Sequence, residues 1–272
     1  LVGDTFVFLS LMVPGTLLLG VNDVLIRRVL RGGRIGEQLF VAFEYIATGL
    51  LLVIPLAIVG MPDLKPGFWG AALITAGLNV FGQWAWYAAF KREEASLISP
   101  LRLVTPPLVI LSGYLVLREA PTAGGIFGIL VTVAGLWLLM RAEAGSRLSF
   151  SSVVRRPGVL LGLVGAFSFA VSLPFDKRAV VGSSALFTVV VVFLVLGFAS
   201  LAIALLRGER AFDFRGNWRT MLVMPFVHAG ASFLTYSALS YALAAYAASV
   251  KRLWSLWAVL LSGKFLEERN IG

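Results

Sequence analysis

Three cations lie inside stretches of sequence that are otherwise apolar. Arg102 follows a proline in "LISPLRLVTPPLVIL", and Lys251 and Arg252 stand side by side in "AASVKRLWSLWAV". A charge at the centre of a bilayer costs about 2.5 to 3.5 kcal/mol on insertion scales unless it faces water, a carboxylate or a ligand. Guanidinium suits bidentate binding of phosphate or carboxylate, and ammonium acts as a compact point charge. These residues are therefore candidates for binding an anionic substrate.

Two further segments carry polar side chains that recur every fourth residue, which places each set on one helix face. The positions are Asn79, Gln83 and Tyr87 in the first segment and His228, Ser232 and Tyr236 in the second. We expect both sets to line a substrate cavity. Hydrogen bonds between helices are the alternative role for such residues in a membrane.

Acidic residues also occur within or near the ends of apolar segments, namely Asp23, Glu44 and Asp176. An internal salt bridge with one of the buried cations is therefore the alternative to substrate binding. Snorkelling of Lys251 to an interface is disfavoured because apolar residues flank it on both sides. We assign Asp23 and Glu44 as coupling residues or counter-ions, since intramembrane carboxylates often carry protons.

The elements that position these residues are transmembrane helices. Of 272 residues, 59% are hydrophobic and 14% are charged, against about 25% charged in ordinary globular chains. A transmembrane helix needs about 20 mostly apolar residues. The sequence predicts an all-α polytopic membrane protein, because unbroken apolar runs favour a helical bundle over a barrel. The predicted spans are 5–27, 38–60, 67–89, 95–117, 122–140, 158–179, 184–206, 217–239 and 243–265.

The chain aligns with itself at a shift of 149 or 150 residues, which indicates an internal repeat. At this shift Arg102 falls on Lys251, Asn79 on His228 and Glu119 on Glu268. We predict repeats at 1–145 and 146–272, the first with five helices and the second with four. Five helices is an odd number, so two such units insert in opposite orientations, as in the inverted repeats of secondary transporters. We expect a tenth helix that is absent from this chain.

Several kinds of chemistry are excluded by composition. The chain has no cysteine and a single histidine, so it has no disulfide framework, Cys/His zinc site or Cys/His nucleophile. The glycine-rich "RGGRIG" at 31–36 follows a predicted helix, whereas phosphate-cradling loops follow a strand. We find no enzyme motif and expect neither a cofactor nor a metal.

The net charge of +9 reflects membrane topology. Lysine and arginine concentrate in alternate links between the predicted helices, as the positive-inside rule requires. This distribution explains the charge without nucleic acid as a partner. It predicts that the link at 27–36 is cytoplasmic and that the protein is a multi-pass protein of the cell inner (plasma) membrane.

The segment "EASLISPLRLVTPPLVILSGYLVLREAPTAGGIFGILVTVAGLWLL" at 94–139 resembles the repeat of EamA-type members of the drug/metabolite transporter superfamily. The resemblance implies a ten-helix bundle with a substrate cavity between its halves and alternating access. Family members usually keep the N-terminus in the cytoplasm, whereas the charge pattern here puts it outside. The Lys-Arg pair of the ninth helix is also similar to that of plastid sugar-phosphate transporters, which implies that Arg102, Lys251 and Arg252 hold phosphate.

The predicted function is secondary transport, as exporter or exchanger, of a small polar metabolite, most simply an organic anion or phosphorylated compound. Alternatives are export of amino acids or amphiphilic zwitterions, flipping of a lipid headgroup, or a membrane scaffold without transport. The expected partners are a small-molecule substrate and the lipid bilayer. A homodimer is left open.

Overall fold

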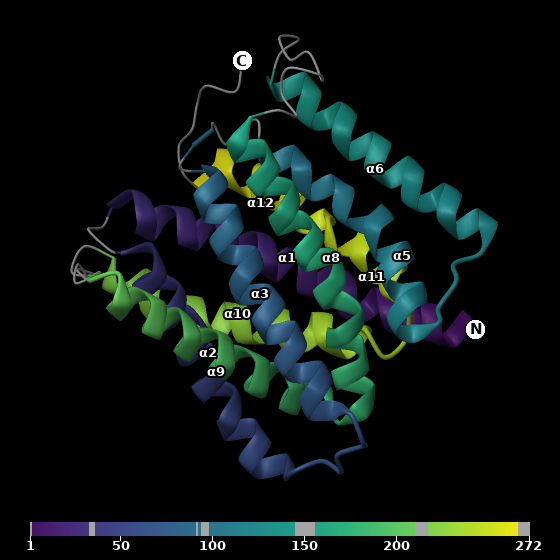
Figure 1. Ribbon diagram of the computed structural model, residues 1–272, viewed down its shortest axis with the longest axis horizontal. Coiled ribbons are helices and arrows are strands. Elements are labelled where there is room, and N and C mark those ends of the chain that lie inside the picture. Colours follow the sequence, from purple (N-terminus) through teal and green to yellow (C-terminus); the bar gives the residue numbers. More distant parts are fainter. Residues whose placement is uncertain are drawn as a thin grey trace. The chain divides into compact units, whose positions relative to one another are not determined.

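The computed structural model describes residues 2–32, 36–90, 92–93, 98–144, 156–209 and 217–265, and every element within these ranges is a helix (Figure 1). The helices are α1 (Val2–Gly32), α2 (Glu37–Val59), α3 (Phe68–Phe90), the 3-10 helix η1 (Ser99–Val104), α5 (Thr105–Leu117), α6 (Ala123–Ala144), α8 (Pro157–Gly182), α9 (Ala185–Leu206), α10 (Trp218–Ala238), α11 (Ala244–Lys251) and α12 (Leu253–Phe265). The prediction of an all-α protein is confirmed.

Five of the described helices are long and apolar enough to cross a membrane. Their spans are Gly3–Ile26, Gln38–Val59, Pro157–Gly182, Ala185–Leu206 and Trp218–Ala238. Each has 21 residues or more, which matches the roughly 30 Å of hydrocarbon in a bilayer. The predicted tenth helix lies outside the described residues.

The fourth and ninth predicted spans are each broken, and in both the break lies at a cation. Residues 99–104 form a 3-10 turn because the prolines at 106 and 107 have no N–H for the carbonyls of Arg102 and Leu103. The carbonyl of Arg102 accepts the N–H of Thr105 instead. The span predicted at 95–117 is therefore irregular at 99–104 and α-helical from Thr105 to Leu117, and residues 94–97 lie outside the described residues.

The second break separates α11 from α12 at Arg252. The carbonyl of Arg252 accepts both the N–H of Ser255 at 3.1 Å and the Ser255 hydroxyl at 2.7 Å. A serine that bonds a nearby carbonyl offers the backbone an alternative to the α-helical ladder. The span predicted at 243–265 is thus two shorter helices joined at the Lys251-Arg252 pair.

The chain divides into two compact units, and each takes segments from both halves of the sequence. The first unit comprises 1–76, 176–242 and 250–272, and the second comprises 77–175 and 243–249. The division falls inside α3 and inside α8. The predicted repeats at 1–145 and 146–272 describe similarity along the sequence, and they remain a prediction.

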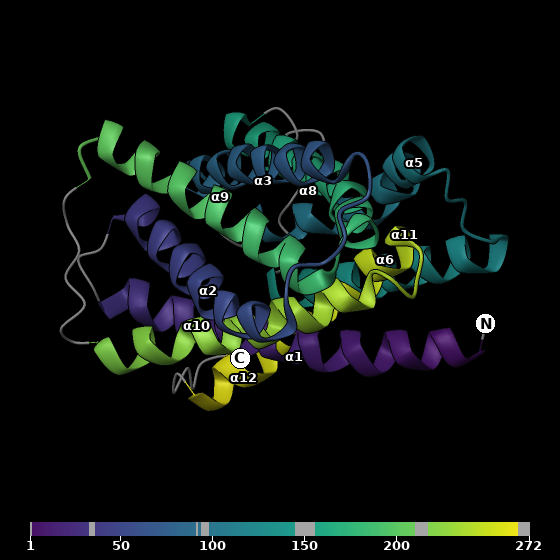
Figure 2. The ribbon, with the colours of Figure 1, turned by 90° about the horizontal axis from the view of Figure 1, so that it is seen from below.

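Within the first unit, α2 packs against α9 and α1 packs against α10 and α12 (Figure 2). Helices α2 and α9 run antiparallel. The carboxylate of Glu209, just after α9, accepts the N–H groups of Gln38 and Leu39 at 3.0 and 3.3 Å, at the start of α2. Beyond the opposite end of α2, the N–H of Lys65 donates to the carbonyl of Gly182, just before α9, at 2.8 Å. Hydrogen bonds therefore tie both ends of the pair.

Two glycines let α2 and α9 approach closely. A Cβ atom at Gly49 would lie 2.9 Å from Cδ2 of Leu194, and one at Gly197 would lie 2.7 Å from Cγ1 of Ile46. Each helix thus supplies one glycine that receives a branched aliphatic side chain of the other. Small residues at such crossings permit the backbone contact that drives helix association in lipid.

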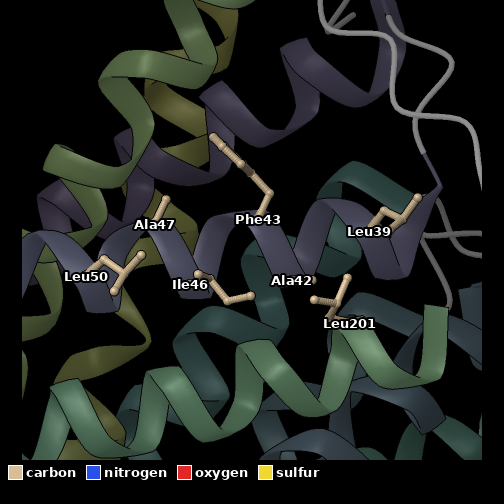
Figure 3. Close-up of a pocket in the computed structure, with 7 residues that line it drawn as sticks. All are labelled: Leu39, Ala42, Phe43, Ile46, Ala47, Leu50 and Leu201. Carbon is tan, nitrogen blue, oxygen red and sulfur yellow. The ribbon is translucent and has the colours of Figure 1, made fainter. Parts of the chain in front are cut away.

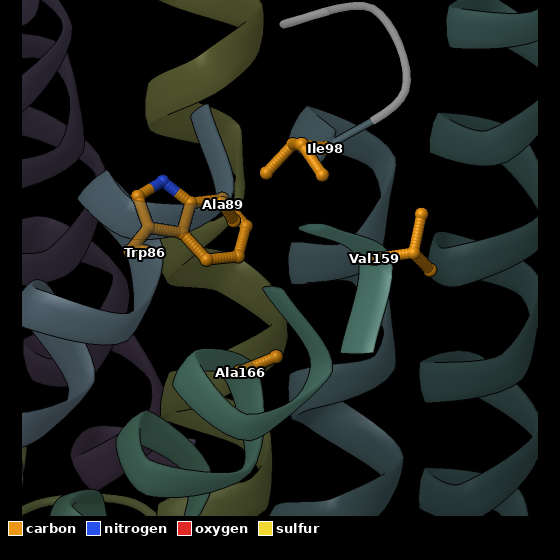
Figure 4. Packing of buried hydrophobic residues seen from close by; sticks show 5 residues of the cluster. All are labelled: Trp86, Ala89, Ile98, Val159 and Ala166. Carbon is orange, nitrogen blue, oxygen red and sulfur yellow. The ribbon is translucent and has the colours of Figure 1, made fainter. Parts of the chain in front are cut away.

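In the second unit, the C-terminal part of α3 packs against the N-terminal part of α8. Its core holds Trp86, Ala89, Ile98, Val159 and Ala166 (Figure 4). The hydroxyl of Ser112 in α5 donates to the carbonyl of Ala170 in α8 at 2.7 Å. This unit therefore brings α3, α5 and α8 together around the segment that carries Arg102.

Candidate functional site

A buried carboxylate on α8 is the centre of a polar cluster in the first unit. Oδ1 of Asp176 accepts the hydroxyl of Thr75 on α3 at 2.6 Å and the hydroxyl of Tyr236 on α10 at 3.1 Å. Asp176 is only 5% exposed. A charge with so little access to water is stable in a membrane only when other groups compensate it.

The compensating cation is Lys251. Its ammonium attracts the carboxylate of Asp176 electrostatically, and it ends α11 immediately before the break in the ninth span. Asp176 is buried and Lys251 is half-buried. Of the acidic residues that the sequence offered as salt-bridge partners, Asp176 is therefore one that acts electrostatically on Lys251. Arg252, also half-buried, is the residue at the break itself.

A second cation of the cluster donates a hydrogen bond to a backbone carbonyl. Lys177, next to Asp176, donates its ammonium to the carbonyl of Ala242 at 2.7 Å, in the turn before α11. Lys177 is 9% exposed. Sequence analysis did not single out this residue, because it lies near the end of a predicted helix, where a cation is ordinary.

Glu44 is the centre of another polar group in the same unit. Its Oε1 accepts Nδ2 of Asn22 on α1 at 2.7 Å, and it lies 3.0 Å from Nδ1 of His228 on α10. That second contact lacks hydrogen-bond alignment. All three residues are buried, with 4 to 6% exposure. Asp23 is half-buried on α1 and makes an interaction of its own.

Aromatic rings link the two polar groups. The ring of Phe193 on α9 lies 5.0 Å from that of His228, 4.8 Å from that of Tyr45 and 6.4 Å from that of Tyr236, between centroids. Tyr45 also lies edge-on to His228 at 5.3 Å. Helix α9 therefore covers the polar face of α10 with an apolar ring.

The polar stripe predicted on α10 is buried along its whole length. His228, Ser232 and Tyr236 are each 3 to 7% exposed. Tyr236 donates a hydrogen bond to Asp176, and His228 lies in contact with Glu44, as described above. The side chains therefore point into the first unit rather than toward lipid.

The stripe predicted on α3 belongs to the second unit. Asn79 and Gln83 are half-buried and make interactions of their own, and the side chain of Tyr87 lies outside the described residues. Arg102, in the same unit, stacks its guanidinium over Trp86 at 4.4 Å and over Phe169 at 5.9 Å, measured to ring centroids. A cation–π contact is worth about 0.5 to 2 kcal/mol. Arg102 and Lys251 lie in different units, so the anion clamp between them remains a prediction.

Sequence reasoning missed Asn22 and Thr75. Thr75 precedes Asn79 by four residues and extends the α3 stripe by one turn, a signal that the sequence contained. Asn22 was adjacent to the more conspicuous Asp23. Only the tertiary structure turns this asparagine toward Glu44.

A groove on the first unit has a different chemistry. It lies where α2 and α9 pack together, and all its lining residues are apolar (Figure 3). They are Leu39, Ala42, Phe43, Ile46, Ala47, Leu50 and Leu201. Such a surface suits hydrocarbon, so it is not the site of a polar metabolite.

Comparison with known proteins identifies the family. The model of the EamA-like transporter family matches residues 7–141 and again residues 156–270. The chain belongs to the EamA-like transporter family. The resemblance found in the sequence is thereby confirmed, and the protein is a multi-pass membrane protein of a family of transporters.

A crystal structure of another protein shares this EamA chain's fold, with a TM-score of 0.76 and 16% sequence identity. The alignment covers 94% of this chain and 88% of that one. No curated protein matches the chain in sequence. The local similarity to sugar-phosphate transporters at Lys251 and Arg252 remains a prediction.

Proposed function

We propose that this protein is a secondary transporter that exports or exchanges a small polar metabolite by alternating access. The proposed substrate is an organic anion or a phosphorylated compound, and the proposed location is the cell inner membrane. The observation that carries the proposal is the buried carboxylate of Asp176, on a helix that is long and apolar enough to span a membrane, with the half-buried cation Lys251 acting on it. Intramembrane charges that face the protein interior commonly mark a substrate or ion pathway.

The broken ninth span supports a binding role for Lys251. Interrupted helices are how transporters bring polar backbone groups and side chains to a site inside the membrane. Here the interruption falls at the Lys251-Arg252 pair. The fourth span, which the sequence repeat equates with the ninth, is also irregular where it carries Arg102. Each repeat would thus present a cation at a weakened point of the equivalent helix.

The arrangement of α2 and α9 supports inverted repeats. These are the second helices of the two sequence repeats, and they run antiparallel with reciprocal glycine contacts. Equivalent helices that run in opposite directions are what inverted insertion produces. Alternating access in such transporters is a rocking of one half against the other around a central site.

A zwitterion is the second candidate substrate. Asp176 places a negative charge beside Lys251, so the first unit offers both an anion and a cation. An amino acid or an amphiphilic zwitterion has the complementary pair of charges. Flipping of a zwitterionic lipid headgroup would use the same two residues.

A ligand screen by thermal shift in detergent tests the proposal. Phosphorylated metabolites, carboxylates, amino acids and lysolipids are added to the wild-type protein, to Lys251→Ala and to Lys65→Ala, whose substituted side chain is exposed in the wild type. A ligand present at a concentration of 100 times its Kd stabilises the folded protein by about 2.7 kcal/mol. We expect an anionic compound to stabilise the wild type and Lys65→Ala but not Lys251→Ala.

The other outcomes are equally informative. Stabilisation by amino acids alone favours the zwitterion, and stabilisation by lysolipids alone favours the flippase. A purely structural salt bridge would make Lys251→Ala unstable by about 3 to 5 kcal/mol, with rescue by Asp176→Asn. That rescue, or the absence of any stabilising compound, would refute substrate binding at Lys251.

A further inference from the structure

The cluster of Asn22, Glu44 and His228 is distinct from the charged residues around Asp176. It joins three helices, α1, α2 and α10, and its members are at most 6% exposed. Within the described residues, Oδ1 of Asn22 and Nδ1 of His228 have no aligned hydrogen-bond partner. A structural network that served only stability would satisfy such buried atoms, because each unsatisfied group costs about 1 to 3 kcal/mol.

The contact between Glu44 and His228 requires a proton. Nδ1 and Oε1 lie 3.0 Å apart, and two lone pairs at that distance repel unless a hydrogen lies between them. Oε1 already accepts from the amide of Asn22, so the shared hydrogen belongs to the imidazole or to the carboxyl group. A neutral imidazole with its N–H at Nδ1 and a pair that has gained a proton both supply such a hydrogen, so the contact is compatible with both charge states of the pair.

The surroundings supply little other charge. Helix α9, which packs on both α2 and α10, has no acidic, basic or histidine residue and presents Phe193 to the imidazole. From α2 the neighbouring group is the phenol of Tyr45, and α1 contributes neutral Asn22 and the adjacent, half-buried Asp23. On α10 itself, the next titratable group is Tyr236, which bonds Asp176.

We propose that Glu44 and His228, oriented by Asn22, form a proton-binding site inside the membrane. Uptake of one proton by a carboxylate and a neutral imidazole changes the charge of the pair from −1 to 0, and no other bond changes. Its use as the coupling ion rests on the transport function proposed above. The link to substrate is α10, whose buried face carries both His228 and the Tyr236 that bonds Asp176.

The single histidine makes the site directly measurable. Protein labelled with [15N]histidine, purified without a histidine tag and without added ligand, gives ring signals from His228 alone. We expect these signals to change with pH over the range in which the protein stays folded, because the ring nitrogens report protonation and tautomer of the imidazole. In Glu44→Gln, the pH dependence of the signals should differ from that of the wild type, since the carboxylate in contact with the ring has been removed.

Three variants complete the experiment. Glu44→Asp keeps a carboxylate and should stay closer to the wild-type curve than Glu44→Gln. Glu209→Gln removes a carboxylate elsewhere in the same unit and should leave the curve unchanged. If Glu44→Gln fails to fold, Asn22→Ala serves in its place, and it should alter the curve while keeping the pair.

A ring that stays neutral in one tautomer over this pH range would overturn the proposal. Identical curves in wild type, Glu44→Gln and Asn22→Ala would overturn it as well. The measurement needs no substrate, so it is independent of the transport function. A pair that binds a proton, in a protein that no compound of the ligand screen stabilises, would leave the proton site standing and refute substrate binding at Lys251.

Discussion

Substitution of Gly197 by alanine tests the close packing of α2 against α9, which supports the proposed inverted arrangement. A Cβ atom there would lie 2.7 Å from Cγ1 and 2.9 Å from the backbone nitrogen of Ile46. Ordinary contacts between carbon atoms are about 3.5 to 4.0 Å. The side chain of Ile46 can rotate away, but its backbone cannot. Helices α2 and α9 must therefore separate by roughly half an ångström or more.

The expected cost follows from this geometry. Overpacking in a close-packed core costs about 1 to 3 kcal/mol, and the better helix propensity of alanine returns up to about 1 kcal/mol. We expect a net loss of about 1 to 2 kcal/mol in the free energy of unfolding. For a chain of this size, each kcal/mol corresponds to roughly 2 to 4 °C in Tm.

Alanine substitutions at two other glycines serve as comparisons, because the space around them differs. At Gly49 the closest atoms belong to the flexible end of Leu194 and the backbone nitrogen is 3.5 Å away, so alanine there should cost less. At Gly77, in the middle of α3, nothing lies within 4 Å of the added Cβ, and alanine should cost nothing. The assay is thermal unfolding of the purified variants in one detergent. A Tm for Gly197→Ala equal to that of Gly77→Ala would refute the close crossing.

Three further predictions concern the ends of the helices, the second unit and the topology. Glu209→Ala leaves two N–H groups at the start of α2 without the carboxylate that accepts them. Thermal unfolding should therefore show that the free energy of unfolding falls by about 0.5 to 2 kcal/mol. A double-mutant cycle of Trp86→Leu and Arg102→Met should give a coupling energy of about 0.5 to 2 kcal/mol, and a value near zero would contradict the stacking. Gly33→Cys, in a chain without native cysteine, should resist an impermeant thiol reagent in intact cells, whereas labelling from outside would place this link outside the cytoplasm.

Hydropathy and residue spacing predicted most of the helices but not the two breaks. A 20-residue apolar window responds to composition, whereas a break depends on which donor reaches each carbonyl. The prolines at 106 and 107 carried that information for the fourth span. In the ninth span, Ser255 closes the turn onto Arg252 through its side chain, and serine is too common in membrane helices to predict this.

The candidate site was predicted residue by residue rather than as pairs. Glu44 and His228 were each identified because charged or titratable groups are rare in apolar segments. Their contact depends on the packing of α2 against α10, which one sequence does not specify. For Lys251, three carboxylates were plausible partners, and the fold brings Asp176 within electrostatic range of it.

The close packing of α2 against α9 through Gly49 and Gly197 also bears on the evolutionary origin of such a chain. Each helix donates a glycine and an aliphatic side chain to the other, so the surface is self-complementary, like the isologous interface of a twofold-symmetric dimer. A single ancestral repeat that inserted into the membrane in both orientations would already have buried these surfaces against a second copy of itself. Duplication and fusion of its gene would then have joined two halves that could pair beforehand, and later divergence would account for differences between the predicted repeats, such as Asn79 in one and His228 in the other.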